Sequence, residues 1–249
     1  MVISVAAKAQ DESYELITDR PDQTESSVSV PHKSLQIETG FVMESTETDL
    51  VDHRAFAYNT TLLRYGLFEN FELRLGLEYL GETVEFKNTG SGNTKSGLSP
   101  LFTGFKVKIS EEDRWKPEVA ILGGLVLPFT TNEDFKPEYT AADIRLAFSN
   151  TFSERLSLGY NLGIVWDGET AIPSYFYSVS LGAGITDRLG MFIESYGLIP
   201  DKGEAEHLLD AGLTFLLLPN LQFDVSGGIG IQNSIDRFIS SGLTYRLPY

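Results

Sequence analysis

The feature that most constrains the fold of this chain is a two-residue alternation of apolar and polar side chains. The stretch "FELRLGLEYL" at residues 71–80 shows it, as does "ERLSLGYNLGIVW" at 154–166. The last ten residues, "SSGLTYRLPY", keep the alternation to the end of the chain. A period of two belongs to a β-strand with one apolar face and one polar face. The chain is therefore expected to be built from strands, each of which needs an apolar medium on one side.

Twelve segments carry this alternation, and no helical period interrupts them. The pattern predicts strands near residues 34–43, 54–66, 70–82, 99–110, 116–127, 140–151, 155–166, 174–185, 188–199, 207–217, 220–231 and 237–248. Short connections at 67–70, 152–154, 186–187 and 218–220 alternate with longer, acidic connections at 44–53, 84–98, 129–139 and 167–173. Such a series of consecutive strands indicates an up-and-down meander.

Charged residues within these segments keep to the polar parity. That parity holds eight acids and seven bases, threaded with glycine and serine. An arginine or lysine facing lipid costs about 2–4 kcal/mol at the middle of a bilayer, so the apolar parity is expected to face outward. The side chains expected to line the barrel interior are Glu38, Arg64, Glu72, Arg74, Glu78, Lys106, Asp143, Arg145, Glu194, Asp224 and Arg246.

These observations predict an all-β fold, a transmembrane antiparallel up-and-down β-barrel of about twelve strands. A soluble β-sandwich also alternates, but its strands are usually about 5–6 residues long. Tyr79, Phe148, Trp166, Tyr175, Tyr245 and Tyr249 are candidates for the aromatic girdles at the two membrane–water boundaries.

An even number of strands places both ends of the barrel on one side, and the short turns mark that side as periplasmic. The final strand must pair with the first to remove the open edge. Its aromatic end resembles the terminal signal that the barrel-assembly machinery reads. The expected location is the cell outer membrane, with its lipid as the surrounding medium and both termini periplasmic.

Composition excludes several other classes of protein. The 249 residues carry a net charge of −16 and contain no cysteine, so disulfide frameworks are excluded and nucleic-acid binding is disfavoured. No stretch approaches the roughly 18 consecutive apolar residues of a membrane-spanning helix.

The region before the predicted barrel divides in two. Residues 1–9, "MVISVAAKA", resemble the tail of a signal peptide, with an ordinary chain terminus as the alternative. Residues 10–33 are polar, contain Pro21 and Pro31 and lack periodicity. They form either a solvated periplasmic tail or a plug inside the barrel. In the second case Arg20 is expected to meet interior carboxylates, while Asp19 and Asp22 meet interior arginines.

This same region carries a family resemblance. "TDRPDQTES" at residues 18–26 and "VPHKSLQIETGF" at 30–41 resemble the start of a family of outer-membrane proteins described as candidate transporters or as phenol-degradation meta-pathway proteins. "LLRYGLFENFELRLG" at 62–76 resembles the second hairpin of the family. Residues 32–34 depart from the family pattern, which usually has a glycine there. The resemblance implies an outer-membrane β-barrel with a role in transport.

No pattern of catalytic or metal-binding residues is present in the sequence. His32, His53 and His207 are scattered, and the glycine-rich stretch at 90–96 lacks the spacing of a phosphate-binding loop. A twelve-stranded outer-membrane phospholipase offers an enzymatic precedent, but only His207 is placed outward as that chemistry needs. We therefore expect neither an enzyme nor a cofactor.

Two functions remain open. The first is passive passage of small solutes, amphipathic or aromatic ones included, through a barrel narrower than a 16-stranded porin. The near balance of interior acids and bases predicts weak ion selectivity. The second is a structural or accessory subunit of a larger envelope complex. Outward polar residues such as Asn59, Thr61 and Ser195 would then face an envelope protein partner rather than lipid.

Overall fold

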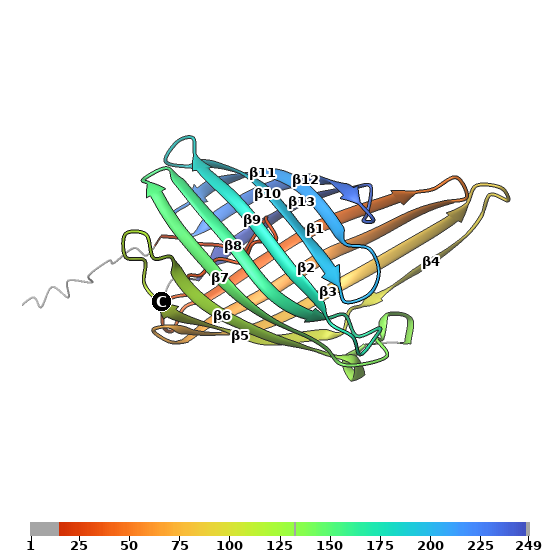
Figure 1. The fold of residues 1–249 in the computed structure, drawn as a ribbon, viewed down its shortest axis with the longest axis horizontal. Helices are drawn as coiled ribbons and strands as arrows, with labels where there is room; N and C mark the ends of the chain where they lie inside the picture. Colours follow the sequence, from red (N-terminus) through yellow and green to blue (C-terminus); the bar gives the residue numbers. More distant parts are fainter. Residues whose placement is uncertain (1–14, 132, 248–249) are drawn as a thin grey trace, which may run out of the picture.

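The protein is a single closed β-barrel with a polypeptide segment folded inside it (Figure 1). A computed structural model describes residues 15–131 and 133–247. The signal-peptide remnant expected at 1–9 and the girdle position Tyr249 lie outside the described residues. Among the described residues, no helix is long and apolar enough to cross a membrane.

Within the described residues, thirteen strands make up the sheet, and each strand is antiparallel to its neighbours. They are β1 (Leu35–Glu47), β2 (Val51–Phe68), β3 (Phe71–Phe86), β4 (Ser91–Leu98), β5 (Leu101–Ser110), β6 (Glu118–Leu127), β7 (Ala141–Ser153), β8 (Leu156–Trp166), β9 (Ser174–Gly184), β10 (Leu189–Pro200), β11 (Glu206–Leu218), β12 (Leu221–Gln232) and β13 (Arg237–Arg246). Two short 3-10 turns, η1 (Pro128–Thr130) and η2 (Glu133–Phe135), follow β6. The barrel closes where β1 pairs with β13, from Gln36 opposite Arg246 to Ser45 opposite Arg237. This closure confirms the predicted all-β barrel and removes the open edge of the last strand.

The wall has twelve strand positions because β4 and β5 share one of them. Both pair with β3, β5 at its first half and β4 at its second half, with Ser99 and Pro100 between them. The expectation that residues 84–98 form a loop is wrong. β3 continues to Phe86 and β4 returns beside it, forming a hairpin that extends beyond the rest of the barrel (Figure 1). The polar composition of this stretch looks like a loop because the hairpin leaves the apolar belt.

Side-chain direction along the strands follows the predicted parity. Leu73, Leu75 and Leu77 are exposed on the outer surface, whereas Glu72 and Arg74 between them are buried inside. The outer surface is thus an apolar belt, and most buried large side chains of the barrel are polar or charged. This reversal of the soluble pattern is the one that a lipid-embedded barrel requires.

The two ends of the barrel differ in the length of their connections. The short β7–β8, β9–β10 and β11–β12 turns lie at the end where the N-terminal segment enters and β13 finishes (Figure 1). The longer β6–β7 and β8–β9 connections and the β3–β4 hairpin lie at the other end. We call these the turn end and the loop end of the barrel.

Candidate functional site in the barrel interior

Residues 15–34, here called the inner segment, run inside the barrel before the chain enters β1. The segment begins at the turn end, where Arg246 Nη1 donates to the Glu15 carbonyl oxygen at 3.1 Å. It returns to the same end, where the Lys33 amide donates to the Gly66 carbonyl oxygen at 2.7 Å. Between these points it meets polar side chains from most of the wall. The segment therefore lies across the interior rather than outside the barrel.

Asp19 forms the centre of a buried ion-pair group, here called the hub. Its carboxylate lies 2.8 Å from Lys106 Nζ, 3.0 Å from Arg64 Nη1 and 3.1 Å from Arg74 Nη2. Although burial alone would raise the pKa of Asp19, Arg64, Lys106 and Arg74 outweigh it and hold that pKa well below its usual range. Asp19 is therefore ionised and binds the inner segment to β2, β3 and β5.

Three further carboxylates complete the hub. Arg64 pairs with Glu72 at 2.9 Å and with Glu38 at 2.8 Å, and Arg74 pairs with Glu25 at 2.8 Å. The hub thus contains four acids and three bases, of which Asp19 and Glu25 come from the inner segment. Arg64 and Lys106 have no solvent-exposed surface. Buried charges of this kind are tolerated only when they are paired, so the hub depends on every member.

Arg20 is held next to the hub by side chains of β12, β13 and β2. Its Nη2 and Nε donate to the two carboxylate oxygens of Asp224 at 3.0 and 3.4 Å, and Nη2 also donates to Ser240 Oγ at 3.1 Å. Gly40 and Gly242 are opposite each other in the β1–β13 ladder. A Cβ at either glycine would overlap the Arg20 guanidinium. These two glycines therefore form the seat in which Arg20 lies.

Asp22 meets carboxylates and hydroxyls, not the arginines expected for it. It lies beside Glu194 and near the Ser180 hydroxyl, and burial together with the Glu194 charge raises its pKa well above 3.8. Glu194 accepts hydrogen bonds from the Gln23 amide at 2.7 Å and from the Thr24 hydroxyl. It also stands directly opposite Asp210 across the β10–β11 ladder. The expectation for Asp22 fails because the segment turns toward β10 after Arg20.

The remainder of the segment is bound by neutral polar groups and by two acids, Glu118 and the hub acid Glu72. Asn161 donates to the Glu25 carbonyl oxygen at 3.0 Å and accepts from the Glu25 amide at 2.7 Å. Ser27 Oγ is 2.8 Å from Glu118 and 2.9 Å from Ser149, and the Val30 amide donates to Glu72 at 2.7 Å. Every limb of the inner segment is therefore attached to the wall.

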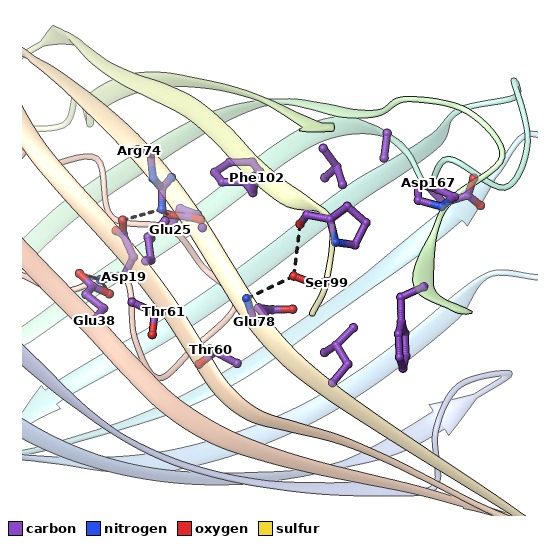
Figure 2. A pocket seen from close by; sticks show the side chains of 18 of the residues that line it. Asp19, Glu25, Glu38, Thr60, Thr61, Arg74, Glu78, Ser99, Phe102 and Asp167 are labelled. Carbon is purple, nitrogen blue, oxygen red and sulfur yellow. Dashed lines mark hydrogen bonds and ion pairs between the residues drawn. The ribbon is translucent and has the colours of Figure 1, made fainter. Parts of the chain in front are cut away.

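Two cavities flank the inner segment inside the barrel. The loop-end cavity has a volume of about 570 Å³ and includes Glu78, Phe102 and Asp167 in its lining (Figure 2). The turn-end cavity, about 590 Å³, is lined by the other face of the segment and by the turn ends of the strands. Arg20 and Glu25 are the two residues that line both cavities. They therefore form the partition between the two ends of the interior.

The other predicted wall residues lie apart from the inner segment. Asp143 pairs with Arg145 at 3.3 Å, and the Arg145 guanidinium lies 4.2 Å from the centre of the Phe176 ring. Glu78 faces the loop-end cavity. Sequence reasoning missed the roles of Thr24 and Asn161, because a neutral side chain on the polar parity gives no signal until its partner is known.

The part of the chain that the structure describes contains no group of three or more His, Asp or Glu side chains placed to hold a metal ion. His207 is hydrogen-bonded through Nδ1 to the Tyr177 hydroxyl at 2.8 Å.

Comparison with known proteins agrees with this architecture. Residues 18–247 match the family described as "Putative MetA-pathway of phenol degradation". The chain belongs to this family. The match begins at Thr18 and so includes most of the inner segment together with the whole barrel. No curated protein sequence matches the chain.

Solved structures with a similar fold include an outer-membrane channel, a porin and the translocator domain of an autotransporter. An outer-membrane channel from Pseudomonas putida F1 is similar with a TM-score of 0.67 at 13% identity, over 88% of this chain and 97% of that one. The NanC porin gives a TM-score of 0.53 at 10% identity, over 86% of this chain and 100% of that one. The translocator domain of the autotransporter NalP from Neisseria meningitidis gives 0.55 at 12% identity, over 86% and 89%. This family member thus has the fold of an outer-membrane β-barrel.

Proposed function

We propose that this barrel is a passive channel for small solutes, in which the inner segment forms the constriction. The observation that carries the proposal is the presence of two cavities, one open toward each end of the barrel, with Arg20 and Glu25 between them. A small solute reaches the partition from either side. It crosses when this part of the segment shifts.

The contacts of the partition suit a segment that moves without disrupting the barrel. Arg20 and Glu25 are held by side chains, with Asp224 and Arg74 as their ion-pair partners. The wall is held by a continuous backbone ladder that closes between β1 and β13. Loss of the segment contacts therefore leaves the wall intact, because backbone pairing does not depend on them.

The orientation in the membrane follows from the two ends of the barrel. Short turns are typical of the periplasmic side of outer-membrane barrels, and longer connections are typical of the outside. We therefore place both termini in the periplasm and the loop-end cavity at the cell surface. Proteolysis of whole cells tests this placement, since the β3–β4 hairpin should be cleaved while Lys33 is protected.

Single-channel recording in planar bilayers tests the channel. The wild-type barrel should give small, resolved current steps. Arg20→Ala should give larger or longer steps, because the Asp224 pair that holds the partition is lost. Arg237→Ala is the matched control, since Arg237 is an exposed arginine whose Nε donates to Ser45 Oγ at 3.2 Å near the loop end. A current no higher than that of lipid alone, in the wild type and in a variant lacking residues 11–33, would exclude the channel.

A second candidate function, an accessory subunit of an envelope complex, is favoured by one polar group on the outer surface. Thr39 Oγ1 and Thr61 Oγ1 both donate to Asn59 Oδ1, at 2.7 and 2.6 Å. These contacts reduce the cost of facing lipid but occupy the oxygen of Asn59, leaving its amide donors for a partner. Extraction from native membranes in mild detergent distinguishes the two functions. A barrel that migrates only as a monomer argues against an obligate complex.

A further inference from the structure

One wall of the loop-end cavity carries an apolar strip. Leu62, Gly76, Phe102, Val126 and Ala141 form one continuous cross-strand row over β2, β3, β5, β6 and β7. Leu62 is opposite Gly76, Gly76 is opposite Phe102, Phe102 is opposite Val126, and Val126 is opposite Ala141. All five line the cavity. We call this row the apolar strip.

Neighbouring residues give the strip its shape. The next row toward the turn end places Gly104 opposite Gly124. The Phe102 ring lies over both glycines, where a Cβ at either position would overlap it. Phe102 therefore lies along the wall and presents a ring face, instead of filling the cavity. Because the strip lines an open cavity, it offers a surface for contact with an apolar part of a solute.

A carboxylate stands directly beside the apolar strip. Glu78 is two residues beyond Gly76 on β3, and its cross-strand neighbour is the uncharged Thr60. Figure 2 shows Glu78 beside Ser99, whose hydroxyl oxygen accepts from the Glu78 amide at 3.2 Å. Among the described residues, no Lys, Arg or His forms an ion pair with Glu78. The carboxylate is therefore available to a cation in the cavity.

The charge that lines both cavities favours the same sign. The loop-end cavity is lined by six carboxylates, Asp19, Glu25, Glu38, Glu78, Asp167 and Glu169, against two guanidiniums, Arg20 and Arg74. The turn-end cavity likewise has six acids against two bases. The hub pairs satisfy Asp19, Glu25 and Glu38, so the uncompensated charge lies at Glu78, Asp167 and Glu169. Clefts lined by one sign of charge concentrate ions of the opposite sign.

We propose that the loop-end cavity binds small apolar cations, with the apolar body on the strip and the positive charge at Glu78. This inference rests on the proposed channel function, because it names the solute class that the channel admits. An aromatic or alkyl ammonium ion of modest size fits a cavity of about 570 Å³. The corresponding anion would meet the three uncompensated carboxylates, Glu78, Asp167 and Glu169, and the neutral compound would use the strip alone.

Calorimetric binding to the purified barrel in detergent tests this proposal without requiring conduction. The probes are benzylammonium, neutral benzyl alcohol and benzoate, which share one ring and differ in charge. Benzylammonium should bind about tenfold or more tightly than benzyl alcohol, because a hydrogen bond to a charged group is added to the ring contact. Benzoate should bind most weakly. Equal affinity for all three probes would overturn the proposal.

Variants assign the two halves of the site. Glu78→Gln should reduce benzylammonium binding to the level of benzyl alcohol and leave benzyl alcohol unchanged. Phe102→Ala should lower the binding affinity of both benzylammonium and benzyl alcohol. Glu204→Gln, at an exposed acid in the β10–β11 loop, is the matched control and should change neither. Unaltered benzylammonium affinity in Glu78→Gln would exclude Glu78 as the cation site.

Recording with the same probes separates this inference from the channel itself. If benzylammonium binds as expected and the wild type carries no current, the cation-binding site is supported and the channel function is excluded. If the wild type conducts and benzylammonium neither binds nor alters the current, the channel stands and the cation site is excluded.

Discussion

Asp19→Asn should release the inner segment from the wall while the barrel stays folded. The Asp19 carboxylate contacts Lys106, Arg64 and Arg74 within 3.1 Å and accepts the Ser26 amide at 3.0 Å. Arg64 and Arg74 keep other acids within 3.0 Å, but the remaining partner of Lys106 is Glu25 at 3.9 Å. Loss of the Asp19 charge therefore leaves a fully buried ammonium group poorly paired.

The expected magnitude follows from the cost of breaking a buried ion pair. Removing one partner typically costs about 3–5 kcal/mol. The lower end applies because the asparagine oxygen still accepts a hydrogen bond from Lys106. About 3 kcal/mol raises the population of the released segment roughly 100-fold, since every 1.4 kcal/mol is about a factor of ten. This free-energy cost lowers the stability of the docked segment and not that of the barrel wall, because the hub side chains take no part in the backbone hydrogen bonds between strands.

Cleavage after Glu25 by a glutamate-specific protease measures this population. Glu25 is held by Arg74 when the segment is docked, so the cleavage rate follows the released fraction. Asp19→Asn should be cleaved about 100-fold faster than the wild type. Asp52→Asn, which breaks an exposed pair with Arg54, should change the rate by less than about threefold. Heat-modifiable migration should be unchanged in both variants. A rate for Asp19→Asn within the range of the control would refute the role of the hub.

Three further predictions follow from individual contacts. The raised pKa of Asp22 means that the docked segment retains a proton, so docking weakens as pH rises above 3.8 toward that pKa. Because its pKa is lowered, Asp19 is ionised from about pH 5 to pH 8 and stabilises the docked segment equally throughout that range. The rate of cleavage after Glu25, divided by the rate for a free peptide to remove the pH dependence of the protease, should therefore rise from about pH 5 to pH 8 in the wild type. In Asp22→Asn this rise with pH should be smaller. An unaltered slope in that variant would contradict the assignment. Gly66→Ala should weaken docking of the end of the inner segment, around Pro31, by about 1–3 kcal/mol, because the new Cβ overlaps the Pro31 carbonyl oxygen. Gly184→Ala is its control, with nothing closer than 3.7 Å, and equal protease sensitivity of the two would count against this contact. Leu213→Arg should destabilise the barrel by about 2–4 kcal/mol in urea titrations in lipid, because Leu213 is 44% exposed on the outer surface. Leu50→Arg, in a loop, should have little effect, and equal midpoints would argue against Leu213 facing lipid.

Much of the barrel could be predicted from local sequence. The predicted strand 174–185 is observed at Ser174–Gly184, and the predicted strand 220–231 at Leu221–Gln232. These bounds were predictable because the alternation depends on nearest neighbours along the chain. The β3–β4 hairpin was missed for the same reason, since a strand pair outside the apolar belt needs no apolar face.

For contacts inside the barrel, the sequence predicted the type of partner but not which residue it is. The Arg20–Asp224 pair joins the inner segment to β12 and agrees with the expectation that Arg20 meets an interior carboxylate. The identity of its partner depends on the path of the segment, as the placement of Asp22 beside Glu194 shows. Local pattern cannot supply that path, because residues 15–34 have no periodicity.

The sequence by itself determined that this chain forms a lipid-facing barrel with a charged interior. Successive side chains of a strand point in turn to the lipid and to the polar interior, so apolar and polar residues must alternate along the sequence. The tertiary structure alone decided which interior groups meet. The apolar strip exists because the register of five strands brings Leu62, Phe102 and Val126 into one row. The partition exists because the inner segment crosses the interior at Arg20 and Glu25. Both depend on contacts between residues far apart in the chain, and closure of the barrel fixes those contacts.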